Sequence, residues 1–169
     1  MVTLLTLILR LFANDGAVDS VPIDRIAMGR IHEDLPGSDR AQKFYTEMLK
    51  KRLPEDQKKE ALLRLARIRK KNRDFPAACS LWEQALENKG FSIEPYEELA
   101  KACEHHLNDL SRAKQYTQRA LENITTLEQL YPYKSYGPFK QSLAWRLQRL
   151  ERKLGRRSVE GDKDSFSVI

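Results

Sequence analysis

The segment Cys103-Glu104-His105-His106 is the one cluster of metal-ligating residue types in the sequence. Cys103 and His106 lie three positions apart, so on a helix they share a face and could supply two ligands to a zinc ion. A structural zinc site needs four ligands, and the sequence has no second pair of cysteines or histidines. We therefore predict no metal site, with Cys103 packed in a helical hairpin and both histidines at a helix end.

Other catalytic patterns are missing from the sequence. The seven glycines are scattered and form neither of the glycine-rich loops that bind phosphate, and no HExxH segment occurs. Glu97 and Glu98 are adjacent, so they do not share a helix face and cannot act as paired carboxylates. We predict no catalytic residue, no cofactor and no small-molecule substrate, and we expect that the protein is not an enzyme.

Two stretches of the chain are strongly basic. Lys50 to Arg73 contains eleven lysines and arginines against three acids, and Lys134 to Arg157 contains eight against one. The formal net charge of the whole chain is +6. This charge permits an acidic partner, such as nucleic acid or an acidic peptide, but does not require one.

A groove lined by basic residues follows if the chain forms stacked helical hairpins, because the first helix of each hairpin would line the concave side. The candidates for contact with a partner are Arg30, Arg64, Arg67, Lys71 and Lys101. Three acids of the third hairpin share this surface: Glu97, Glu98 and Glu104. The groove could receive an acidic peptide, a terminal carboxylate or a nucleic-acid backbone. Alternatively, these charges only keep a helical array soluble. Asparagines, which assist carboxylate binding in known repeats, are missing from these positions.

The last predicted helix carries a second basic surface. Its apolar residues form one stripe with helical spacing: Phe139, Leu143, Leu147, Leu150 and Leu154. Three cations are expected opposite this stripe, where they could contact the phosphates of nucleic acid: Arg146, Arg149 and Lys153. Trp145 is interpreted as a packing residue, because no other aromatic residue accompanies it on that side.

The elements that would position these residues are visible as an internal repeat. Leu65-Ala66 recurs as Leu99-Ala100, 34 residues later. Asp74-Phe75, Ala78 and Ala85-Leu86 are matched 35 residues later by Asp109-Leu110, Ala113 and Ala120-Leu121. A more divergent copy precedes them at an offset of 37 residues. A helix, a short turn and a second helix with small residues at fixed places are typical of the tetratricopeptide repeat.

Small residues in each copy predict where the two helices of a hairpin cross. Close crossing requires a small side chain at the contact, while larger apolar groups fill the space between neighbouring hairpins. The predicted crossings join Ala66 to Ala78 and Ala100 to Ala113. In the divergent copy, Met28-Gly29 occupies the place of Leu65-Ala66, and Tyr45 occupies the place of Trp82.

These patterns predict an all-α fold, a tetratricopeptide-like helical-hairpin solenoid with a C-terminal capping helix. The expected segments are an apolar helix in 1–14, three hairpins in 22–52, 55–90 and 92–130, a capping helix in 137–155 and a disordered tail in 156–169. Arg10 interrupts the apolar run of the first segment, so we expect a buried helix and no membrane association. Cys79 and Cys103 are interpreted as reduced packing residues, which favours a cytoplasmic location.

Several segments carry a resemblance to a known family: VTLLTLILRLFA, GRIHEDL, RDFPAACSLWEQAL, EPYEELAKACEHHLNDLSRAKQYTQRAL and LAWRLQRLERKL. Together they span residues 2 to about 154 and resemble the C-terminal region of bacterial RNase H-like proteins of the YprB type. In that family a DEDD-type exonuclease domain precedes a short tetratricopeptide region. No residue here matches the nuclease's acidic metal ligands, so the resemblance implies a separated or truncated repeat region without catalytic residues.

Two functional hypotheses follow. The first is a non-catalytic tetratricopeptide-repeat interaction module that presents its groove to a protein or peptide partner. The alternative is an accessory nucleic-acid-binding domain of an RNase H-like exonuclease. Steep weakening of nucleic-acid binding with added salt would favour the alternative.

Overall fold

The computed structural model describes residues 25–34, 38–87 and 92–165, with side chains at 25–34, 39–87 and 92–156. Every regular element in these ranges is a helix, which confirms the prediction of an all-α fold. The helices are α2 (Arg25–Asp34), α3 (Ser38–Leu49), α4 (Glu55–Lys71), α5 (Phe75–Glu87), α6 (Glu94–His105), α7 (Leu110–Leu130) and α8 (Gly137–Ser165). The predicted apolar helix in 1–14 lies outside the described residues.

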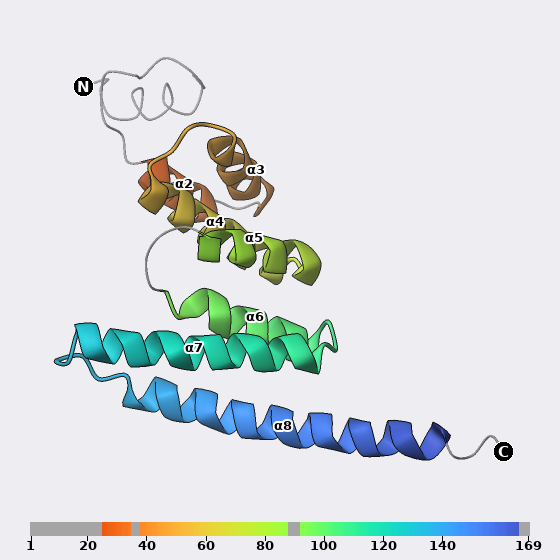
Figure 1. Ribbon diagram of the computed structural model, residues 1–169. Coiled ribbons are helices and arrows are strands. Elements are labelled where there is room, and N and C mark those ends of the chain that lie inside the picture. The colour runs from red at the N-terminus through yellow and green to blue at the C-terminus, as the bar shows by residue number, and fades with distance from the viewer. Residues whose placement is uncertain (1–24, 35–37, 88–91, 166–169) are drawn as a thin grey trace, which may run out of the picture.

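Consecutive helices pack as pairs, α2 with α3, α4 with α5 and α6 with α7, and α8 lies along α7 (Figure 1). The helix α4 also contacts α2 and α3, and α6 contacts α5, so each pair packs on the one before it. None of the helices in the described ranges combines the length and the apolar character needed to cross a membrane.

The turns within the second and third pairs have the same backbone geometry. Arg73 has a φ of 61° and Asn108 a φ of 55°, a left-handed conformation that residues other than glycine seldom adopt. The aspartate after each of them accepts a hydrogen bond from the backbone N–H three residues later, at 3.3 Å for Asp74 and 2.9 Å for Asp109. These caps begin α5 and α7. The sequence repeat is therefore also a repeat of turn geometry.

Small residues occupy the interior of the pairs, as the repeat pattern predicts. All four alanines of the predicted crossings are fully buried: Ala66, Ala78, Ala100 and Ala113. Ala66 and Ala78 belong to one core cluster with Trp82, and this cluster also contains Leu99 of α6. Trp82, which is fully buried, therefore joins the second pair to the third.

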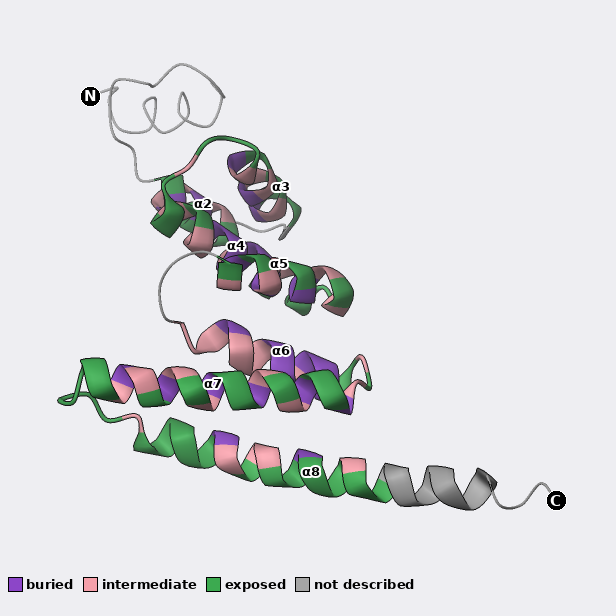
Figure 2. Ribbon diagram, in the orientation of Figure 1, coloured by how far each residue is buried: buried purple, intermediate pink, exposed green. Residues whose placement is uncertain are grey.

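The helix α8 differs from its prediction in two respects. Leu143 and Leu150 are buried against residues of α7, but Phe139, expected in the same stripe, is 51% exposed. Figure 2 shows the buried part of α8 on its side toward α7. Phe139 stands in the first turn of α8 and does not join the buried stripe, although the neighbouring Lys140 still pairs with Glu128 of α7 at 2.7 Å. The helix also continues to Ser165, which corrects the expectation of a disordered tail from residue 156. The added segment contains no proline that would end it.

Gly29 is required at the crossing of α2 and α3. A Cβ atom built on Gly29 would overlap the ring of Tyr45, which is fully buried and donates a hydrogen bond to Glu33 at 2.6 Å. We predict that Gly29→Ala lowers the free energy of unfolding by about 1–3 kcal/mol, because the ring cannot move aside without repacking. Urea denaturation followed by circular dichroism measures this change.

The matched control is Gly155→Ala in α8. A Cβ atom there meets no other atom within 4 Å. Alanine favours the helix over glycine by about 0.5–1 kcal/mol, so this variant should be as stable as the parent protein or more stable. If Gly29→Ala were as stable as Gly155→Ala, the close approach of Gly29 to the ring of Tyr45 would be contradicted.

Candidate functional site

Charged residues of α2, α4 and α6, the first helices of the three pairs, form one surface that we call the first-helix face. Arg64 of α4 lies 3.0 Å from Glu33 of α2 and 2.7 Å from Glu60, and its side chain is only 15% exposed. Glu33 also accepts the hydrogen bond of Tyr45. Burial, and then this hydrogen bond, raise the pKa of the Tyr45 hydroxyl. Arg64 therefore joins the first two pairs.

The contact between α4 and α6 continues this surface. Arg67 donates two parallel hydrogen bonds to Glu94, at 2.7 and 2.6 Å. Lys70 pairs with Glu98, and Lys101 lies 3.1 Å from the same carboxylate. Burial raises the pKa of Glu98, but the hydrogen bonds from the two lysines outweigh it, so the pKa lies below its usual value.

Four of the five predicted groove residues therefore lie beside acids of the same chain. Arg30 lies 4.0 Å from Glu60, Lys101 lies 2.7 Å from Glu97, and Arg64 and Arg67 are paired as above. Lys71 is exposed and makes no ion pair with any residue that the structure describes. The face carries both signs of charge, and its acids, which the sequence placed on the third hairpin alone, also come from α2 and α4 as Glu33 and Glu60.

The ion pairs between neighbouring helical pairs repeat at equivalent positions. Two positions of the repeat supply these charges. The first is occupied by Glu33, Lys70 and Glu104, at the repeat offsets of 37 and 34 residues, and the second by Arg64 and Glu98, which are 34 residues apart. Glu33 pairs with Arg64, and Lys70 with Glu98, so the two junctions use the same positions with opposite signs. Glu104 occupies this position in the last pair and contacts α8 instead.

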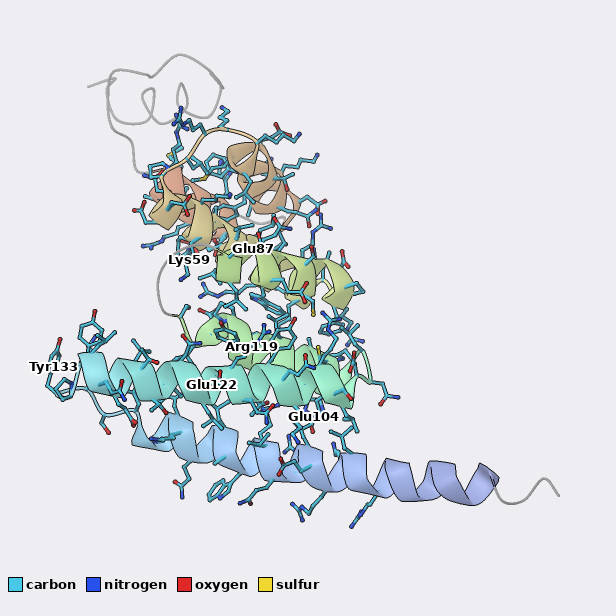
Figure 3. All side chains as sticks on the ribbon, viewed as in Figure 1. Lys59, Glu87, Glu104, Arg119, Glu122 and Tyr133 are labelled. Carbon is cyan, nitrogen blue, oxygen red and sulfur yellow. The ribbon has the colours of Figure 1, made fainter. Side chains whose placement is uncertain are left out.

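Three cations of α8 converge on Glu104, whose side chain is fully buried. Arg149 binds it at 3.1 and 2.7 Å, Lys153 at 2.9 Å and Arg146 at 3.1 Å. Burial alone raises the pKa of Glu104, but the hydrogen bonds from Arg149 and Lys153 lower it to about 2. We call these four residues the Glu104 cluster; Figure 3 shows Glu104 beside α8.

The Glu104 cluster corrects the prediction for Arg146, Arg149 and Lys153. These residues do not lie opposite the apolar stripe of α8; they flank it and reach the buried carboxylate. The three cations are spaced three and four residues apart, so they form a stripe of their own along α8. The sequence alone did not show that an acid of α6 lies opposite this stripe. One carboxylate compensates only one of the three positive charges, so the cluster retains an excess of positive charge.

Exposed aromatic residues gather where α7 meets α8. Tyr133 is 78% exposed, and Tyr131 contacts its ring at 6.1 Å between centroids. Tyr133 lies at the turn between the two helices (Figure 3). Trp145 of α8 is 65% exposed, which corrects its interpretation as a packing residue. The stripe of α8 that contains Trp145 is turned away from the buried Leu143 and Leu150, so no neighbouring helix covers it.

The Cys103-Glu104-His105-His106 segment is used for packing. Cys103 is fully buried, and His106 stacks on Phe75 with 3.5 Å between the ring centroids. Burial raises the pKa of the other thiol, Cys79, to about 11, and both cysteines are free. Within the described ranges, no three histidines, cysteines or acids are arranged to hold a metal ion.

An open hollow of about 320 Å³ lies between α3, α4 and α5. Leu49, Leu65 and Leu81 are among the four apolar residues of its lining. Arg69 also lines the hollow, and its guanidinium lies 3.3 Å from the carboxylate of Asp74. The other half of its lining is polar and includes Arg69, Ser80 and Gln84, so the hollow is of mixed character.

Neither known family models nor curated proteins match this chain. The resemblance to RNase H-like proteins therefore stays a prediction.

The Glu104 cluster yields a test of how α8 is held. We predict that Glu104→Gln lowers the free energy of unfolding at pH 7 by about 2–4 kcal/mol, because it leaves the mostly buried guanidinium of Arg146 without its carboxylate. The control is Glu128→Gln, which removes the exposed pair of Glu128 with Lys140. That change should cost less than about 1 kcal/mol in the same urea titration.

The same residue sets a dependence on pH. The pKa of Glu104 is lower in the folded chain, at about 2, than its ordinary value of 4.5, so its stabilisation is complete above pH about 5 and is lost as the pH falls toward 2. We expect the stability difference between the parent protein and Glu104→Gln to shrink over this range. A constant difference would show that the carboxylate is not held by the cations.

Proposed function

We propose that the chain is a non-catalytic interaction module of the tetratricopeptide type that binds an acidic segment of a protein partner on its first-helix face. The equivalent turns at Arg73 and Asn108 and the equivalent junctions of the three pairs support the repeat class. The two free, buried thiols are in keeping with a cytoplasmic location.

The observation that carries the proposal is the exposed pair of Arg67 with Glu94. The guanidinium presents two parallel donors to a carboxylate, while the two side chains remain 47% and 38% exposed. Exposed ion pairs contribute only about 0–1 kcal/mol, so a partner's carboxylate can replace Glu94 at little cost. Lys71, one turn further along α4, offers a second positive charge to the same partner.

The affinity of a selected peptide tests this proposal. A displayed library of random peptides is selected on the parent protein, and enriched sequences are titrated by calorimetry. We expect enrichment of aspartate and glutamate, and a dissociation constant raised at least about tenfold in the double variant Arg67→Ala/Lys71→Ala, because two charge-assisted hydrogen bonds are lost.

Arg119→Ala is the matched control, because Arg119 is an exposed arginine of α7, away from the first-helix face (Figure 3). Its affinity for the selected peptides should equal that of the parent protein. Peptides that lack acidic enrichment, or that bind the double variant as tightly as the parent, would refute the proposal.

A further inference from the structure

The exposed apolar side chains of the described residues are concentrated at one end of the molecule. Six large hydrophobic residues are exposed, and five of them lie between positions 130 and 145: Leu130, Tyr131, Tyr133, Phe139 and Trp145. Four of these five are aromatic. The most exposed rings are those of Tyr133 at the α7–α8 turn and Trp145 in the first half of α8, while the ammonium group of Lys134 lies over the ring of Tyr131, 5.2 Å from its centroid.

Positive charge surrounds the same residues. Between Lys134 and Arg156 the chain has seven lysines and arginines but a single acid, Glu151, which pairs with Lys114 of α7 at 3.0 Å. Arg152 and Arg156 are exposed and form no ion pair with any described residue. The cations of the Glu104 cluster add further excess charge. The first-helix face differs, because acids there accompany most of the cations.

The helical spacing aligns an aromatic ring with these cations. Trp145, Arg152 and Arg156 are separated by seven and four residues, so they share the stripe of α8 that is turned away from the buried Leu143 and Leu150. At 1.5 Å per residue, the path from Gly137 to Arg156 is about 29 Å long. The tyrosines of the turn extend this path beyond the start of α8. We call this surface, with Tyr131, Tyr133 and Lys134, the aromatic–basic track.

We propose that the aromatic–basic track binds single-stranded nucleic acid. Unpaired bases stack on exposed aromatic rings, and cations beside the rings follow the phosphate backbone. A duplex keeps its bases stacked on one another, so it can use the cations but not the rings. A lipid surface would require a broad apolar helix face, and the apolar face of α8 is buried against α7. This surface is separate from the proposed peptide site on the first-helix face.

Fluorescence anisotropy with labelled oligonucleotides of about 16 residues tests the proposal. The probes are oligo(dT), oligo(rU), a DNA duplex of equal length and a poly-glutamate peptide of equal charge. We expect at least one of the two single strands to bind about tenfold more tightly than the duplex. Contacts with three to five phosphates predict an affinity that falls about 20–100-fold between about 50 and 200 mM salt.

Variants separate stacking from charge. Trp145→Ala should weaken single-strand binding about 5–100-fold, while Trp145→Phe should retain most of it, because phenylalanine still offers a ring face. Arg152→Ala/Arg156→Ala should weaken binding and reduce the slope of affinity against salt. Ile31→Ala, which removes the one exposed large hydrophobic residue outside this end, should bind as the parent does.

Two results would overturn the proposal. One is duplex or poly-glutamate binding as tight as single-strand binding and unchanged by Trp145→Ala, which would mark a general polyanion surface. The other is the absence of single-strand binding at about 50 mM salt by a protein whose circular dichroism shows it to be folded.

Discussion

A charge pair recurs at equivalent positions of successive junctions between the helical pairs, beside the apolar contacts that join them. Glu33 meets Arg64 at the first junction, and Lys70 meets Glu98 at the second, with the signs reversed. Stacking the third pair directly on the first would place Glu33 beside Glu98, two like charges, which is destabilising. The small residues set how closely the helices approach, whereas these ion pairs disfavour that one wrong order. Glu104, at the equivalent position of the last pair, forms ion pairs with three cations of α8.

This arrangement divides the charge of the molecule unevenly. Acids of the first-helix face accompany most of its cations, so that face presents both signs to a partner. At α8 positive charges outnumber negative ones, because Glu104 alone compensates three cations. Arg152 has no acidic partner among the described residues. The exposed aromatic residues lie at this same end. Two surfaces of one chain therefore have different chemistry.

Local patterns in the sequence predicted the all-α fold, because they report on contacts within a hairpin. The small residues predicted at the crossings are buried in the structure. The surfaces were predicted less well, because the partner of a cation lies on the neighbouring pair, 27 to 31 residues away, as for Arg67 with Glu94 and Arg64 with Glu33. Helical periodicity shows which residues share a face of one helix, so it does not reveal a pair between two helices. The orientation of Trp145 was likewise missed, since the sequence does not show which side of α8 meets α7.

A double-mutant cycle on Lys70 and Glu98 tests the central claim most directly. Lys70→Glu and Glu98→Lys each place like charges at the junction, and the two together restore an opposite pair. Our account predicts that the double variant is more stable than the sum of the two single losses by about 1 kcal/mol or more in urea unfolding. Strictly additive losses would show that the junction does not depend on this ion pair.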